Sequence, residues 1–170
     1  MFKLKETFNS VISSWDVSKV THMNNMFCGA KSFNQPLNNW NVSKVINMRC
    51  MFNGATSFNR PLDKWQVNNV INMEEMFQIA LSFNQSIINW DVGNVIDMRK
   101  MFYGALSFEQ PLNNWDVSKV KHMKDMFSGI RTKLSKKPLW YQQYILISCR
   151  CERYGRKECC CDPYLVWESI

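Results

Sequence analysis

The chain has 170 residues, of which 46% are hydrophobic and 21% are charged, a composition that excludes a disordered chain and indicates a folded domain. The formal net charge is +7, and residues 131–170 carry 8 basic and 4 acidic side chains, so the C-terminal part is the most basic. Such a segment can favour nucleic acid or an anionic surface. Basic and aromatic residues do not interleave there, so we favour a role in solubility.

The N-terminal residues, Met1–Phe8, contain no apolar run of signal-peptide length, and Glu6 interrupts the segment. The longest apolar candidate, Tyr144–Ile147, is far shorter than the roughly 18 residues of a membrane span. We therefore expect a chain without an export signal or a membrane span, located in the cytoplasm or within an assembly.

A unit of 25 residues recurs five times between about Phe8 and Ile130. Seven positions of the unit hold the same residue in every copy, which chance does not produce. The tryptophan column contains Trp15, Trp40, Trp65, Trp90 and Trp115. The other invariant columns begin at Phe8, Val17, Val20, Met23, Met26 and Phe27. Because one unit buries too little apolar surface to fold alone, the units must stack so that these columns form a shared core.

The first half of each unit has the spacing of a leucine-rich-repeat strand. Leu37, Trp40 and Val42 follow the pattern L-x-x-L-x-L. Trp40 and Val42 also alternate with polar residues, as in a half-buried strand. We therefore predict a short strand at this place in every unit.

The second half of each unit carries an apolar stripe at positions i, i+3, i+4 and i+7, which favours a helix of about two turns. In the second unit the stripe comprises Met48, Met51, Phe52 and Ala55. Asn47 precedes the stripe as an N-cap, and Gly54 serves as a C-cap. The predicted fold class is therefore α/β, a leucine-rich-repeat solenoid of about five strand–turn–helix rungs.

The pattern over Trp15–Leu37, with Trp-Asp-Val-Ser-Lys-Val, Met-x-x-Met-Phe and Phe-Asn-Gln-Pro-Leu, resembles the BspA-like leucine-rich repeat family. The resemblance covers about Phe8 to Gly129, three quarters of the chain. It implies a right-handed solenoid used for protein binding, often on cell surfaces, with no enzymatic activity and no cofactor. The absence of an export signal departs from that surface role, and residues 131–170 match nothing in the repeat.

Polar side chains between the buried positions of the predicted strands should face outward on one side of the solenoid. The candidate partner-binding residues on this strand face are Asp16, Lys19, Asn41, Lys44, Gln66, Asp91, Asp116 and Lys119. The face carries few of the aromatic residues that dominate interface hot spots, so we expect modest affinity. The alternative is that these positions are merely solvated and were retained when the repeat was duplicated.

Residues suited to catalysis are scarce. His22 and His122, the two histidines, occupy the same repeat position four units apart. At about 4.8 Å per unit they lie about 19 Å apart, too far to share a metal or form a catalytic dyad. No Gly-rich phosphate loop, nucleophile elbow or His-Glu-x-x-His motif occurs. We therefore expect no enzymatic activity, no cofactor and no small-molecule substrate.

Residues 131–170 form a second predicted region, a basic, Cys-rich cap or tail that follows the repeat domain of residues 1–130. Trp140 falls at the sixth place of the tryptophan column, and the apolar residues around it could cover the last rung. Five of the seven cysteines lie here: Cys149, Cys151, Cys159, Cys160 and Cys161. Their spacing matches no standard zinc motif, which leaves free thiols, a soft-metal site, disulfides and lipid attachment as alternatives.

The sequence as a whole favours a non-enzymatic scaffold that binds a protein partner through the solenoid surface. One alternative is a structural component of a larger viral or cell-surface assembly, joined by end-to-end or homo-oligomeric packing. A second alternative is a metal- or redox-responsive role for the Cys-rich tail.

Overall fold

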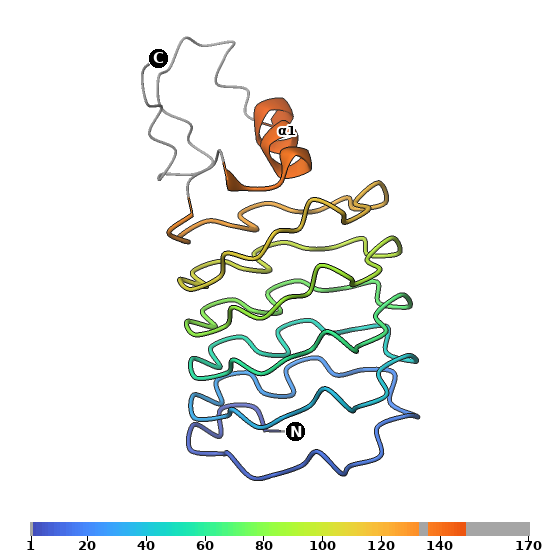
Figure 1. Ribbon diagram of the computed structural model, residues 1–170, viewed down its shortest axis with the longest axis vertical. Helices are drawn as coiled ribbons and strands as arrows, with labels where there is room; N and C mark the ends of the chain where they lie inside the picture. The colour runs from blue at the N-terminus through green and yellow to red at the C-terminus, as the bar shows by residue number, and fades with distance from the viewer. Residues whose placement is uncertain (1, 133–135, 149–170) are drawn as a thin grey trace.

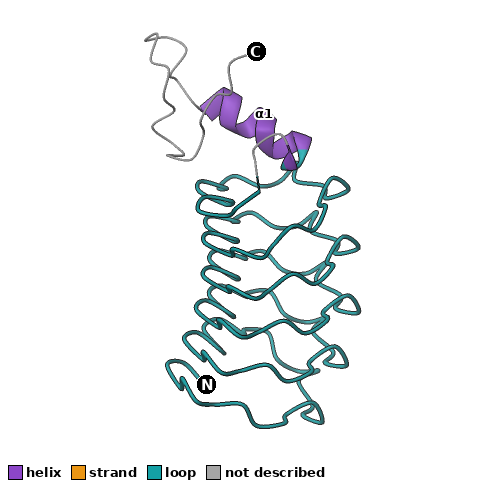
Figure 2. Ribbon diagram, turned by 60° about the vertical axis from the view of Figure 1, so that its left-hand side comes forward, coloured by secondary structure: helices purple, strands orange, loops and turns teal. Residues whose placement is uncertain are grey.

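A computed structural model describes residues 2–132 and 136–148 of the chain. The 25-residue units form coils, here called rungs, that stack along one axis from the N-terminus to a helix at the opposite end (Figure 1). This helix, α1, spans Leu139–Ser148 and is the one helix among the described residues. The rungs themselves consist of turns and loops (Figure 2).

Each rung is built from consecutive tight turns. In the second rung, five backbone hydrogen bonds each join a buried apolar residue to another three positions earlier. The pairs are Leu37–Trp40, Val42–Val45, Met48–Met51, Phe52–Ala55 and Ala55–Phe58. The two residues between the ends of each turn are mostly polar and point away from the core. The apolar spacing of three in the sequence is therefore the spacing between the two ends of a turn.

The helix predicted over residues 48–55 is wrong, and β-turns replace it. Cys50 has a φ of 54° and Gly54 a φ of 68°, so the chain leaves the right-handed helical region twice in this short segment. Asn47 is not a helix cap but closes a turn, because its Oδ1 accepts the N–H of Arg49 at 2.9 Å. The i, i+3 apolar spacing fits a run of turns as well as it fits a helix, which is why the pattern misled.

The predicted strand around Trp40 and Val42 is also wrong, since no β-element longer than one bridge occurs within the described residues. Isolated parallel bridges join the rungs at one repeat position: His22–Asn47, Asn47–Asn72, Asn72–Asp97 and Asp97–His122. Beyond this position, alternate N–H groups donate to the next rung, as from Cys50 N to Glu74 O at 2.9 Å. The groups between them close turns within the rung, so no continuous ladder forms. The α/β leucine-rich-repeat solenoid is thus replaced by a stack of rungs built from turns.

Aromatic side chains fill the core as continuous columns. The rings of Phe52 and Phe77 stack with centroids 5.5 Å apart, and those of Trp65 and Trp90 with centroids 6.3 Å apart. The indole N–H of Trp90 also donates to the carbonyl of Leu62, 28 residues earlier, at 3.0 Å. This bond is repeated by Trp40, Trp65, Trp115 and Trp140. The tryptophan column therefore joins rungs by hydrogen bonding as well as by packing.

An asparagine column ties the rungs together at the Phe-Asn-Gln-Pro-Leu motif. Asn34 Oδ1 accepts the N–H of Asn59 at 3.0 Å, and Asn59 Oδ1 accepts the N–H of Asn84 at 3.0 Å. The neighbouring Gln85 donates its side-chain amide to Asn59 Oδ1 at 2.9 Å. These bonds give the motif a structural role, because they satisfy backbone donors in a segment outside the turns and join neighbouring rungs.

The two ends of the stack are covered differently. At the N-terminal end the ring of Phe2 stacks on Phe27 with centroids 5.7 Å apart, but Trp15 is 39% exposed. At the C-terminal end α1 places Tyr141 against Phe127 in an edge-on contact, with centroids 4.8 Å apart. Across residues 2–132 and 136–148, no helix is long and apolar enough to cross a membrane.

Candidate functional site

The predicted strand-face residues are all exposed, but one column of them also supports the turns. Asp16 Oδ1 accepts the N–H of Ser18 at 2.9 Å, and Asp116 Oδ1 accepts that of Ser118 at 2.9 Å. Hydrogen bonds from these serines lower the pKa of both carboxyl groups. The same turn contact is made by Asn41 to Ser43 and by Asp91 to Gly93. Exposure in this column therefore does not by itself indicate binding.

An open groove of about 960 Å³ lies beside the lysine column of the predicted face. Its floor is a row of isoleucines one rung apart, Ile46, Ile71 and Ile96. The side chains of Ile46 and Ile71 are 38% and 45% exposed, although large aliphatic residues elsewhere in the rungs are mostly buried. The other lining residues are Thr21, Lys44, Asn69, Asn94, Ser118, Lys119, Val120 and Lys121. We call this site, which crosses all five rungs, the isoleucine groove.

The walls of the isoleucine groove are polar and basic. Asn94 donates to the carbonyl of Asn68 at 2.8 Å and accepts a hydrogen bond from Lys119 Nζ at 2.7 Å. Lys44 and Lys121 form no ion pair within the part of the chain that the structure describes. No Asp or Glu lines the groove. The groove thus combines an apolar floor with lysines near both of its ends.

Only two of the predicted partner-binding residues, Lys44 and Lys119, line the isoleucine groove. Asn41 and Gln66 instead border a separate polar hollow of about 380 Å³. The remaining predicted residues, Asp16, Lys19, Asp91 and Asp116, line neither.

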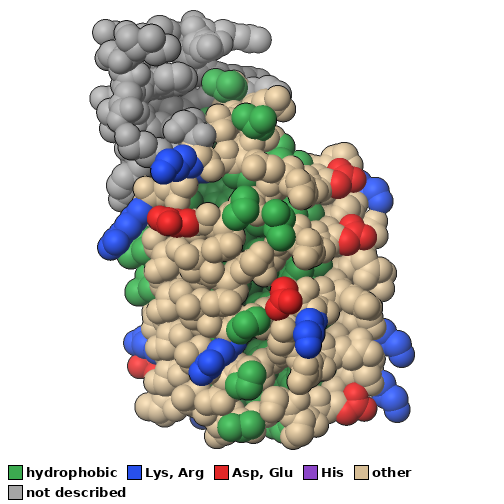
Figure 3. Space-filling model, in the orientation of Figure 1, with side chains coloured by type: hydrophobic (Ala, Val, Ile, Leu, Met, Phe, Trp, Pro, Cys, Tyr) green, Lys and Arg blue, Asp and Glu red, His purple; other side chains and the backbone are tan. Residues whose placement is uncertain are grey.

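Sequence reasoning missed the isoleucines because their column is not invariant. It reads Thr21, Ile46, Ile71, Ile96 and Lys121, and it falls in the segment assigned to the link between strand and helix. The available signal was three large aliphatic residues at a position that the repeat core does not need. Figure 3 shows that exposed hydrophobic side chains occur in broken lines on an otherwise polar surface.

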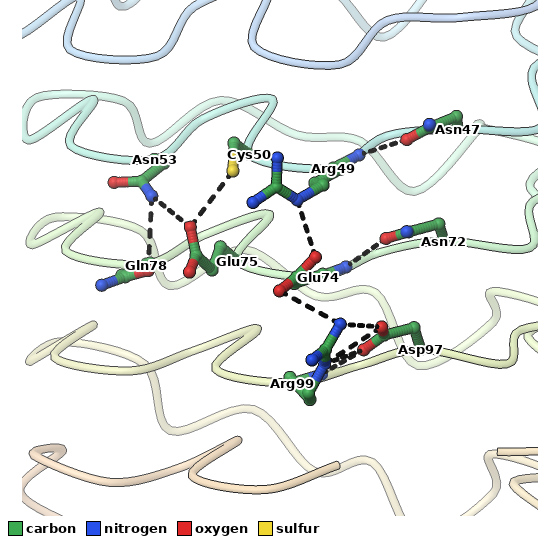
Figure 4. Close-up of polar contacts among 10 residues, drawn as sticks. All are labelled: Asn47, Arg49, Cys50, Asn53, Asn72, Glu74, Glu75, Gln78, Asp97 and Arg99. Atoms are coloured by element: carbon green, nitrogen blue, oxygen red, sulfur yellow. Dashed lines mark hydrogen bonds and ion pairs between the residues drawn. The ribbon is translucent and has the colours of Figure 1, made fainter. Parts of the chain in front are cut away.

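A second polar cluster lies on the adjoining part of the rungs (Figure 4). Glu74 receives Arg49 Nε at 2.6 Å from one neighbouring rung and lies 3.3 Å from Arg99 Nη2 of the other. Arg99 also contacts Asp97 Oδ2 at 2.6 Å. The carboxylates of Glu74 and Asp97 are thus held by guanidinium groups, and the contacts of Glu74 link three neighbouring rungs.

Cys50 and Glu75 lie beside this network. Cys50 Sγ donates to Glu75 Oε2 at 3.2 Å, and burial with this contact raises the pKa of the Cys50 thiol to about 12. The thiol is therefore protonated and a poor nucleophile near neutral pH. Among the residues that the structure places, no group of three or more His, Cys, Asp or Glu side chains could hold a metal ion. The cysteines at 149, 151, 159, 160 and 161, which were weak metal candidates, lie outside the described residues.

Comparison with known families gives one match. The model of the family described as "Mycoplasma protein of unknown function, DUF285" matches residues 1–81 and again residues 61–140. The chain belongs to this family. Neither the search of curated proteins nor the search of solved structures found a match.

DUF285 membership accounts for the repeat, because the two overlapping matches together cover every rung. The family is related to the BspA-like repeats. In this DUF285 chain the isoleucine groove extends over both matched segments, from Thr21 in the first to Lys121 in the second. The groove is thus a property of the stacked array and not of a single unit.

Proposed function

We propose that this chain is a non-enzymatic interaction module that binds a partner protein through the isoleucine groove. The observation that carries the proposal is the row of isoleucines along the stack, in which Ile46 and Ile71 are exposed and Ile96 is half-buried. Exposed apolar patches of this kind mark binding surfaces, because leaving them in water costs free energy that a partner recovers by covering them. The similarity of the repeats to the BspA-like family, whose members bind proteins, supports the same role.

The basic walls of the isoleucine groove would orient a bound partner. Lys44, Lys119 and Lys121 would steer an acidic partner toward the groove and fix its register, while the isoleucines would supply the burial. This combination corresponds to the apolar centre and polar rim of ordinary protein interfaces.

The proposal is tested by affinity capture with the full-length protein and two matched variants. Ile71→Glu places a charge on the groove floor, and Ile79→Glu makes the same change at a residue 41% exposed that does not line the groove. We expect a specific partner to be retained by the wild type and by Ile79→Glu and lost by Ile71→Glu.

The captured protein is then produced separately and its affinity is measured by calorimetry. An affinity about tenfold weaker for Ile71→Glu, with unchanged thermal unfolding, supports the groove. Equal affinity for both variants would show that binding occurs elsewhere.

A further inference from the structure

We infer that the isoleucine groove holds an amphipathic α-helix of a partner protein, with acidic residues at both ends of its apolar stripe. This inference rests on the proposed binding function and adds the conformation and charge of the partner segment. Three features of the groove lead to it: its paired backbone, the spacing of its isoleucines and the sign of its charge.

The backbone groups of the three isoleucines are already hydrogen-bonded between rungs. Ile71 N donates to Ile46 O at 2.9 Å, and Ile71 O in turn accepts Ile96 N at 2.8 Å. The same bonds join Ile46 to Thr21 and Lys121 to Ile96. An extended peptide that binds by strand addition obtains its affinity from main-chain hydrogen bonds, and the N–H and C=O groups of the three isoleucines are already used between rungs. A helix satisfies its own backbone and needs only a surface for its side chains.

The spacing of the isoleucines also favours a helix. Rungs joined by parallel bridges lie about 4.8 Å apart, and side chains on one face of a helix are about 5–6 Å apart. Over three steps, the helix side chains therefore move out of register with the isoleucines by only about 2 Å. Same-face side chains of an extended peptide are about 6.6 Å apart and fall about 5 Å out of register, a whole rung, over three steps. The row of Thr21 to Lys121 spans about 19 Å, the length of about 13 helical residues.

The positive charge of the groove favours a partner helix with acidic residues at both ends. Lys44 lies toward one end of the row, Lys119 and Lys121 lie at the other, and no carboxylate lines the space between them. A second copy of this chain would bring the same lysines against these. Residues 149–170 carry 4 basic and 4 acidic side chains and so supply no net negative charge. A partner helix with carboxylates at both ends of its apolar stripe therefore matches the charge of the groove better than a second copy of this chain or residues 149–170 would.

The test uses the full-length protein and a fluorescent peptide of about 14 residues, long enough to span the row as a helix. The probe carries leucines at i, i+3, i+4, i+7 and i+11 and glutamates at both ends. Three control peptides keep its length. One spreads the leucines around the helix, one has lysines in place of the glutamates, and one has a central proline that prevents the helix. Anisotropy measures each affinity.

We expect the probe to bind the wild type and Ile79→Glu equally, and Ile71→Glu about tenfold more weakly. Each control peptide should also bind the wild type about tenfold more weakly than the probe does. Equal binding of the proline peptide would overturn the helical conformation, and equal binding of the lysine peptide would overturn the acidic flanks. Absence of probe binding would overturn the inference as a whole. The proposed function would still stand in that case if the captured partner depended on Ile71.

A photo-crosslinking residue in place of Ile71 identifies which molecule occupies the groove. Crosslinking to the probe, blocked by excess unlabelled probe, is the expected result. Crosslinking instead to residues 149–170 of the same chain, or to a second copy, with the probe present, would show that the groove is filled by this protein itself and would overturn the inference.

Discussion

Tryptophan side chains connect neighbouring rungs by one hydrogen bond that recurs along the stack. Trp90 is buried, and its indole N–H donates to the carbonyl of Leu62 at 3.0 Å. Replacing the indole with a phenyl ring would remove this hydrogen bond, which costs about 1 kcal/mol, because the Leu62 carbonyl still accepts the backbone N–H of Trp65 at 3.1 Å. The smaller ring would add a loss of packing. The tryptophan column is therefore a polar as well as an apolar requirement of the fold.

Trp90→Phe is expected to lower the free energy of unfolding by about 2 kcal/mol or more. Trp15→Phe provides the control, because Trp15 is 39% exposed and its indole has no such acceptor among the described residues. That variant should change stability by less than about 1 kcal/mol. Urea denaturation followed by circular dichroism measures both. Similar losses would show that ring packing, and not the hydrogen bond, determines the tryptophan column.

At the scale of elements, the sequence predicted which residues are buried but not the conformation that buries them. The tryptophan, methionine and phenylalanine columns were identified as core, and they are buried in the inner rungs. The helix was wrong because a residue pattern with spacing of three does not distinguish a helical turn from a β-turn. The evidence against a helix lies in the backbone, where Cys50 and Glu75 adopt left-handed conformations. Such conformations are expected at glycine, so these two residue types gave no sign of them in the sequence.

Helix α1 closes one end of the stack with several side chains, of which Tyr141 is the most deeply buried. Tyr141 is fully buried against Phe127, whereas Leu146 on the same helix is 55% exposed. Tyr141→Ala is therefore expected to lower the free energy of unfolding by about 3–5 kcal/mol, the usual cost of truncating a buried aromatic side chain. Leu146→Ala, measured by the same thermal unfolding, should cost less than about 1 kcal/mol. If the two variants are equally stable, α1 does not close the core.

At the scale of the whole molecule, the repeat predicted the stacking, and the groove appears only after stacking. Ile46 and Ile71 are 25 residues apart, and nothing in a single unit marks them as neighbours on a surface. The parallel bridge beside them, from Asn47 to Asn72, brings them onto one line. The 25-residue repeat places the isoleucines in one column, but only the conformation of the rungs shows that this column is exposed, whereas the buried columns follow from the invariant apolar positions of the repeat.

Stacked rungs also predict a gradient of local stability, because each rung is held mainly by its neighbours. Phe27, Phe77 and Phe102 are all fully buried, and their N–H groups donate to the next rung at 2.8 Å, 2.9 Å and 2.9 Å. Burial and hydrogen bonding are therefore matched, and only the position in the stack differs. Phe27 lies in the N-terminal rung, where Trp15 is exposed, and Phe102 lies one rung from the end that α1 covers.

Hydrogen exchange measured by NMR should show the amide of Phe27 exchanging about tenfold faster than that of Phe77, with Phe102 close to Phe77. Tyr141→Ala should remove this asymmetry, because uncovering the C-terminal end allows that rung to open and should speed exchange at Phe102 before exchange at Phe77. Equal rates at all three amides in both proteins would mean that the stack opens only as one cooperative unit. In that case, the rungs would not open independently from an exposed end.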